Sequence, residues 1–164
     1  MVPEGVEELE AGPPEEIAVE NAYRKASAIE RADALVLGVD TIVCIGRRIY
    51  GKPADAEEAR KTLRALSGHD HAVLSGVCLI DEARTRTAAA RTLVRFRVLD
   101  EALLDWYVRS EEWRERAGGY AIQGRGAALV ERIEGDYLNV VGLPVATLLE
   151  LAPGLVGDPA LESG

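Results

Sequence analysis

The sequence of 164 residues has little of what marks secreted or membrane proteins. Its only two cysteines, Cys44 and Cys78, lie in apolar runs, which indicates buried free thiols in a reducing compartment rather than a disulfide framework. No apolar run reaches the roughly 18 residues that a membrane span needs. The acidic start also lacks the apolar segment of a signal peptide. We therefore expect a cytoplasmic protein without a membrane partner.

Positive charge is scarce as well, with 19 Lys and Arg against 28 Asp and Glu and a net charge of −9. Such an acidic chain is a poor match for nucleic acid, because binding there depends on cations that neutralise phosphates. A small anionic ligand in one locally basic pocket remains compatible with this charge. Lysine is the rarer cation, found only as Lys25, Lys52 and Lys61, so each lysine position is a candidate for function.

The pattern of apolar residues predicts one α/β domain over residues 1–152, followed by a flexible tail at 153–164. Asp55 and Asp100 are typical helix N-caps, and Gly46 with Arg47 forms a typical hairpin turn. Hairpins between strands imply at least some antiparallel pairing. We expect helices at 14–31, 56–66, 101–108 and 145–151, and strands at 35–45, 49–50, 72–80, 87–98 and 128–133.

Asp40 is the first residue that is out of place, because it lies within the otherwise apolar strand at 35–43. A buried carboxylate is costly unless it is paired, hydrogen-bonded or bound to a metal. One interpretation is a strand-end aspartate that backbone amides satisfy. A functional carboxylate is the favoured interpretation, since buried acids in apolar strands are uncommon.

Two of the three lysines lie at positions that are candidates for function. Lys52 lies between Gly51 and Pro53, in a stiff loop that allows close backbone approach, and a compact point charge there suits phosphate. Lys25 lies beside the apolar stripe of the first helix. Taken singly, the favoured interpretations are a solvated turn lysine for Lys52 and, for Lys25, a lysine whose ammonium extends to the surface.

Other polar motifs are weaker. The glycine-rich stretch at 118–126 could hold an anion with backbone N–H groups, but it lacks the ending of a Walker A motif and could be a simple connector. His69 and His71 are interpreted as turn histidines rather than zinc ligands. Asp136 and Asn139 are interpreted as helix caps.

Taken together, six ordered blocks resemble the Maf family of nucleoside triphosphate pyrophosphatases, from about residue 5 to 151. The blocks are NAYRKA at 21–26, GVDTIV at 38–43, GKPADAEEA at 51–59, LSGHDH at 66–71, AGGYAIQGRGA at 117–127 and EGDYLNVVGLP at 134–144.

The resemblance implies a Maf fold, a mixed twisted sheet flanked by helices, and hydrolysis of a nucleoside triphosphate between its α- and β-phosphates. It also implies a divalent cation, Mg²⁺ or Mn²⁺, and allows a homodimer, about which composition is silent. By this resemblance, the family's catalytic base maps onto Asp40, and its metal ligands map onto Asp40 and Glu8. Its phosphate-binding lysines map onto Lys25 and Lys52. Its substrate-selecting residues map onto Thr41 and Gln123.

Gln123 in its Ile-Gln-Gly context resembles the subfamily that prefers dTTP and UTP, whereas a sister subfamily linked to 7-methyl-GTP has glutamate there. The family normally opens with a strand and a Ser-x-Ser-Pro-Arg-Arg loop that binds the triphosphate, and this sequence begins at what resembles the second strand. We therefore expect the first strand to be missing. Three hypotheses stay open: a dTTP/UTP pyrophosphatase, a catalytically impaired nucleotide-binding protein, and a 7-methyl-GTP or purine triphosphate pyrophosphatase.

Overall fold

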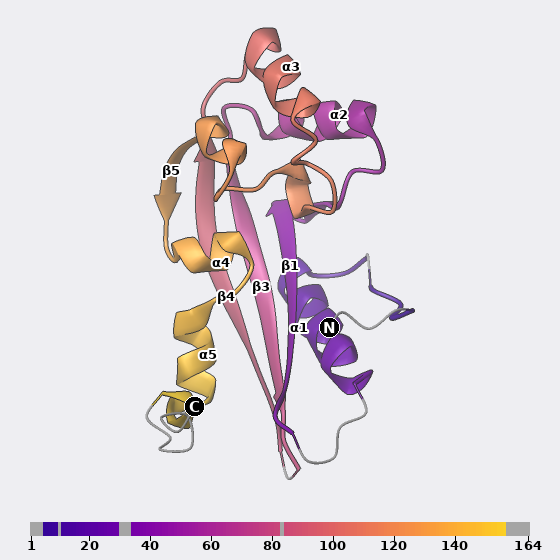
Figure 1. Ribbon diagram of the computed structural model, residues 1–164, viewed down its shortest axis with the longest axis vertical. Coiled ribbons are helices and arrows are strands. Elements are labelled where there is room, and N and C mark those ends of the chain that lie inside the picture. The colour runs from indigo at the N-terminus through magenta and orange to yellow at the C-terminus, as the bar shows by residue number, and fades with distance from the viewer. Residues whose placement is uncertain (1–4, 10, 30–33, 83, 157–164) are drawn as a thin grey trace.

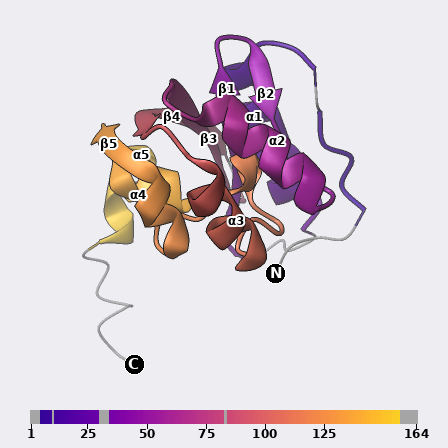
Figure 2. The same cartoon turned by 90° about the horizontal axis from the view of Figure 1, so that it is seen from above.

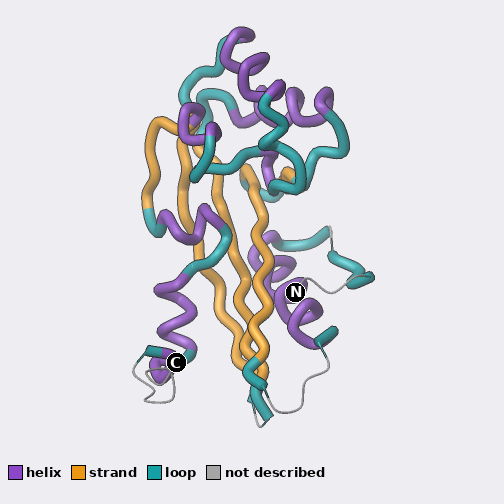
Figure 3. Tube along the Cα trace, in the orientation of Figure 1, coloured by secondary structure: helices purple, strands orange, loops and turns teal. Residues whose placement is uncertain are grey.

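The computed structural model describes residues 5–9, 11–29, 34–82 and 84–156, which form one sheet with helices around it (Figure 1, Figure 3). The strands are β1 (Val36–Ile45), β2 (Arg48–Tyr50), β3 (Asp70–Ile80), β4 (Thr85–Phe96) and β5 (Val130–Glu134). The α-helices are α1 (Pro14–Ser27), α2 (Ala56–Leu66), α3 (Glu101–Arg109), α4 (Tyr137–Val141) and α5 (Val145–Leu151).

The sheet has the strand order β2-β1-β3-β4-β5. The expected α/β class, with a sheet flanked by helices, is confirmed, and the described strands pair only antiparallel, without the parallel pairing of a mixed sheet. β1 pairs with β3 along nearly its whole length, which places Asp40 opposite Gly76 and Thr41 opposite Ser75. β2 pairs only with the end of β1, from Val43 onward. The described part of β1 before Val43 therefore has a paired strand on one side only.

Helix α1 lies directly against the backbone of β1 and β3, because two glycines face it. A Cβ at Gly38 would lie 2.1 Å from the carbonyl oxygen of Ala22, and a Cβ at Gly76 would lie 2.1 Å from that of Ala18. Any larger residue at either position would push the helix away from the sheet. This close approach lets side chains of α1 reach the middle of β1, where Asp40 lies.

The other helices cover the opposite face and one end of the sheet. Figure 1 shows α4 and α5 on the side away from α1, and α2 and α3 together at one end of the strands. The view from above in Figure 2 also separates α1 from α4 and α5. The largest hydrophobic cluster includes Leu63, Val73, Phe96 and Tyr107, so it joins α2 and α3 to the sheet.

Most predicted boundaries agree with the structure because local signals set them. The carboxylates of Asp55 and Asp100 accept hydrogen bonds from the N–H groups of Glu58 and Leu103, each at 2.8 Å, which caps α2 and α3. The prediction for the first helix runs too far, since α1 ends at Ser27.

The short helix α4 is absent from the predicted elements, although its N-cap, Asp136, agrees with the interpretation as a helix cap and accepts a hydrogen bond from the N–H of Leu138. The same interpretation is wrong for Asn139, which lies inside α4, is buried and donates to the carbonyl oxygen of Val73.

Other expectations concern the thiols and the chain end. Cys44 and Cys78 are buried free thiols, as predicted. Within the predicted tail, residues Pro153–Leu155 form a 3₁₀ helix, and residues 157–164 lie outside the described part of the chain. None of the described helices is both long and apolar enough to cross a bilayer.

Candidate active site

Asp40 lies at the centre of a buried polar cluster between α1 and β1. Its side chain is 9% exposed, and its Oδ1 accepts a hydrogen bond of 2.5 Å from the ammonium of Lys25. The amide of Asn21 donates to Oδ2 over 3.3 Å. Asn21 is itself held by the backbone of Leu9, whose N–H donates to the Asn21 Oδ1 at 2.7 Å. The Asp40 carboxylate is therefore paired and fixed in position, as a buried charge requires.

Lys25 lies between two carboxylates, since its ammonium also contacts Glu8 Oε1 at 2.7 Å. Burial disfavours the charged form of Lys25, but the hydrogen bonds to Asp40 and Glu8 outweigh this effect, so the pKa of Lys25 is raised above its usual 10.5. The lysine remains a cation at physiological pH, and the first helix delivers it to the same point as the carboxylates of Asp40 and Glu8.

Two adjoining cavities open beside this cluster, and we call them together the Asp40 cleft. The first is lined by Lys25, Asp40, Thr41, Lys52 and Gln123 among other residues. The second shares Asp40, Thr41 and Lys52 with it and adds Glu8. All six residues that the sequence singled out therefore line the Asp40 cleft. Because Asp40 and Thr41 point to opposite faces of β1, the cleft runs around the edge of this strand.

Two side chains of the cleft enter it from outside the Asp40 cluster. Thr41 faces away from α1, and its hydroxyl lies 2.9 Å from that of Ser75 on β3, with either able to donate. Lys52 follows β2 on a loop and is 53% exposed, and its ammonium lies 3.8 Å from the carboxylate of Glu115. This is a long contact between exposed groups, so Lys52 remains available to another anion.

Gln123 is exposed on the glycine-rich segment, and three anchors hold that segment from below. The Tyr120 hydroxyl and Nε2 of buried His71 form a hydrogen bond of 2.9 Å. The N–H of Ala121 donates to the hydroxyl of Tyr107, and that of Arg125 donates to Glu112. The backbone on both sides of Gln123 is therefore fixed, while its amide is left to face the cleft.

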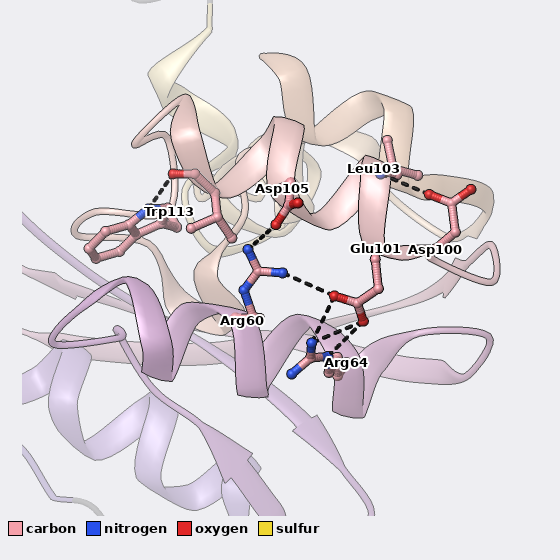
Figure 4. A network of polar contacts seen from close by, with 8 residues as sticks. Arg60, Arg64, Asp100, Glu101, Leu103, Asp105 and Trp113 are labelled. Carbon is pink, nitrogen blue, oxygen red and sulfur yellow. Dashed lines mark hydrogen bonds and ion pairs between the residues drawn. The ribbon is translucent and has the colours of Figure 1, made fainter.

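Helix α3, which provides the Tyr107 anchor, is in turn fixed to α2 by ion pairs. Figure 4 shows Arg60 and Arg64 of α2 extending to Glu101 and Asp105 of α3. The Arg64 guanidinium contacts Glu101 at 2.8 Å. Because these pairs are exposed, we interpret them as setting the orientation of α3 rather than as a large source of stability.

His71 is a correction to the sequence analysis, which interpreted it as a turn histidine. It lies in β3, only 1% exposed, between the rings of Phe96 and Tyr120. Burial lowers its pKa to about 4, although nearby Asp70 acts in the opposite direction. His71 is therefore a neutral support beneath the Tyr120 side of the cleft.

The sequence predicts that Asp40 and Glu8 bind a divalent cation, and the structure shows which donor groups lie near them. No three His, Cys, Asp or Glu side chains in the described ranges form a group that could hold a metal ion on their own. The carboxylates of Glu8 and Asp40 do converge, since both contact the ammonium of Lys25. Carboxylates suit a hard cation such as Mg²⁺, which commonly takes its other ligands from water and substrate phosphates, and such a cation would share these two carboxylates with the ammonium of Lys25.

Comparison with known proteins shows which family this chain belongs to. The description "Maf-like protein" matches residues 1–154, which is nearly the whole chain. The chain belongs to the Maf-like family. The fold and the resemblance deduced from the six sequence blocks are confirmed by this match.

Several curated relatives of the Maf-like chain carry the name dTTP/UTP pyrophosphatase. The relative from Pyrococcus furiosus is 47% identical over 140 residues, covering 84% of this chain and 74% of the relative. The one from Deinococcus radiodurans is 45% identical, covering 86% and 73%. The one from Thermococcus gammatolerans is 44% identical, covering 92% and 82%.

Three groups of residues at the cleft have no role in the predictions made from the sequence. Asn21 precedes Lys25 by about one helical turn, so two polar residues at this spacing beside the apolar stripe of the helix are a usable signal. Val140, Val141 and Gly142, at the end of α4, form one wall. Glu115 and Arg116 form part of the rim, and nothing in their local sequence marks them.

Proposed function

We propose that this chain hydrolyses nucleoside triphosphates to the monophosphate and pyrophosphate, with dTTP and UTP as substrates. The observation that carries the proposal is the convergence of Lys25, Asp40, Thr41, Lys52 and Gln123 on one cleft. The names of the curated relatives support this substrate class and do not favour 7-methyl-GTP or a purine nucleotide.

In the proposed reaction, Asp40 takes a proton from a water molecule whose oxygen attacks the α-phosphorus. The bond from that phosphorus to the oxygen bridging to the β-phosphorus breaks, and pyrophosphate leaves with the bonding electrons. Lys25 and Asn21 hold the Asp40 carboxylate in place, and the Oδ2 atom has the longer hydrogen bond, so it is the freer one to accept the proton. Lys25 and Lys52 offset the charge of the phosphates.

Glu8 and Asp40 are the residues that would hold the divalent cation that we propose. When bound, such a cation supplies charge neutralisation and alignment of the phosphates. The amide of Gln123 can both donate and accept hydrogen bonds, which suits the edge of a uracil or thymine base. We also propose a cytoplasmic location, where nucleotides are present and the unpaired Cys44 and Cys78 stay reduced.

Pyrophosphate release tests the proposal directly. The purified chain is incubated with dTTP, UTP, 7-methyl-GTP or ITP, each with Mg²⁺, with Mn²⁺ or with EDTA. We expect turnover of dTTP and UTP that needs the cation. Turnover of 7-methyl-GTP or ITP alone would replace the substrate assignment, and activity that persists in EDTA would exclude the metal. Binding without turnover would favour a catalytically impaired nucleotide-binding protein.

A further inference from the structure

The cations that line the Asp40 cleft differ in how far neighbouring carboxylates neutralise them. Lys25 contacts two carboxylates, and Lys52 lies 3.8 Å from one. Arg116 also lines the cleft, is exposed, and within the described part of the chain its side chain makes no hydrogen bond or ion pair. An uncompensated guanidinium at the rim of an anion-binding cleft is available for a ligand, and its planar fork suits phosphate oxygens.

The backbone around Arg116 is tied to the loop that carries Lys52. The N–H of Gly118 donates to the carbonyl of Gly51 at 3.1 Å, one residue before Lys52. On the other side, Trp113 is buried, and its indole N–H donates to Val108 at 3.0 Å (Figure 4). Arg116 and Lys52 therefore lie on two loops that a hydrogen bond holds together.

Gly118 and Gly119 explain why these loops can meet. Both have left-handed backbone conformations, with φ of 68° and 70°. A Cβ at Gly118 would lie 2.9 Å from the side chain of Val43, and one at Gly119 would lie 3.1 Å from Pro53. The two glycines thus seat the Arg116 segment against β1 and the Lys52 loop.

Glu115, the neighbour of Arg116, has the left-handed backbone that is uncommon for a residue with a side chain, with φ of 56°. Its carboxylate is the one that faces Lys52, and it is 88% exposed. A strained residue beside a ligand cleft commonly reflects a functional constraint. Here the backbone conformation of Glu115 places its carboxylate beside Lys52, where a phosphate group could replace it.

We propose that Glu115 and Arg116 form a phosphate-recognition element with Lys52. Arg116 binds the triphosphate together with Lys52, and Glu115 occupies Lys52 in the free protein until phosphate displaces it. This proposal rests on the proposed function, because the anion that Arg116 and Lys52 bind is taken to be the triphosphate of the nucleotide substrate. Neither residue needs to take part in bond breaking, so both act on substrate affinity.

Binding of inorganic tripolyphosphate with Mg²⁺, measured by titration calorimetry at low salt, tests Arg116 without any turnover. We expect Arg116→Gln to weaken binding about 10-fold or more, since a charge-assisted hydrogen bond is lost. Arg116→Lys should restore only part of the affinity, because it returns the positive charge without the planar fork. The matched control is Arg114→Gln, because Arg114 lies two residues away, pairs with Glu111 and is not part of the cleft.

Unchanged tripolyphosphate binding in Arg116→Gln, with the far-ultraviolet circular dichroism of the wild type, would overturn the role of Arg116. Equal losses in Arg114→Gln would do the same, because they would show a general effect of charge. For Glu115→Gln we expect binding about twofold to threefold tighter, as a competing exposed charge is removed. Weaker binding in Glu115→Gln would overturn the displacement step.

The KM for dTTP separates this proposal from the proposed function. If the wild type hydrolyses dTTP and Arg116→Gln raises KM while kcat is kept, both proposals are supported. If the wild type releases no pyrophosphate from any nucleotide but Arg116→Gln still weakens tripolyphosphate binding, the proposed function fails and the phosphate-recognition element stands. If the wild type hydrolyses dTTP and Arg116→Gln leaves KM unchanged, the phosphate-recognition element is wrong and the proposed function stands.

Discussion

The two lysines of the Asp40 cleft are held in opposite ways. Lys25 comes from a helix, is 19% exposed and contacts two carboxylates within 2.7 Å. Lys52 comes from a loop, is 53% exposed and has one carboxylate at 3.8 Å. Coulomb attraction is much stronger at short range and away from water, so the first lysine is fixed and the second is free to change partners.

This contrast separates two tasks within one cleft. The buried cluster of Asn21, Lys25 and Asp40 is held together by its own hydrogen bonds, which suits the catalytic role that we propose for Asp40. The exposed rim of Lys52, Glu115 and Arg116 keeps charge that a mobile anionic ligand can use. We therefore expect substitutions in the buried cluster to affect turnover and stability, and those at the rim to affect affinity.

The largest expected effect is at Asp40. Asp40→Asn keeps the shape of the side chain but removes the proton acceptor, so kcat should fall about 10³-fold or more. Pyrophosphate release with dTTP measures it. Asp100→Asn is the matched control, because Asn also caps helices and Asp100 lies outside the cleft. An unchanged kcat in Asp40→Asn would remove Asp40 from the mechanism.

The second expected effect concerns the buried, neutral His71, which forms a hydrogen bond with Tyr120 in the segment that carries Gln123. His71 titrates near 4 in the folded chain and near 6.5 when unfolded, so below pH 6.5 the unfolded chain binds the extra proton first. Stability should therefore fall as pH drops from 7 to 4, by about 3 kcal/mol from this group.

Urea denaturation at several pH values measures this loss. The loss should be absent in His71→Gln and retained in His69→Gln, which replaces the exposed histidine two residues away. If His71→Gln loses as much stability on acidification as the wild type, the buried histidine does not couple folding to pH.

The third expected effect tests the fixed lysine. Lys25→Met leaves Asp40 and Glu8 without their shared cation and should lower the free energy of unfolding by about 2 kcal/mol at pH 7. Lys61→Met is the control, because Lys61 pairs with Glu57 on an exposed surface and its loss should leave the urea midpoint unchanged.

The stabilisation by Lys25 should also depend on pH. Because the folded pKa of Lys25 lies above 10.5, its contribution should be complete below pH 10.5 and decline as pH rises through the folded value. Equal stability of Lys25→Met and the wild type at pH 7 would contradict the view of Lys25 as the fixed member of the pair.

The fold was predictable where a local signal sets the structure. Asp55 and Asp100 marked helix starts correctly because an N-cap acts within three residues. Helix α4 was missed because its five residues are too few to show a period. The interpretation of His71 as a turn residue is wrong because the strand is predicted to begin at residue 72, whereas β3 already begins at Asp70.

The site was predictable where a residue contradicts its surroundings. Asp40 was found because a charge in an apolar strand is costly, and the rarity of lysine drew attention to Lys25 and Lys52. Asn21 depends on the close packing of α1 against Gly38 and Gly76, which is a tertiary effect. Arg116 is one of many arginines, and only its place on the cleft distinguishes it.

The smallest expected effect is at Gln123, which lines the Asp40 cleft together with Lys25 and Lys52. Gln123→Glu keeps the size of the side chain and removes the amide N–H donor, so kcat/KM for dTTP and UTP should fall about 10-fold. Because His71, Tyr107 and Glu112 fix the surrounding backbone, the change should leave the melting temperature unaltered. Activity with 7-methyl-GTP is compared in the same assay. If the substrate profile stays the same, Gln123 does not read the base, and Thr41 and the wall formed by Val140, Val141 and Gly142 become the candidates for selection.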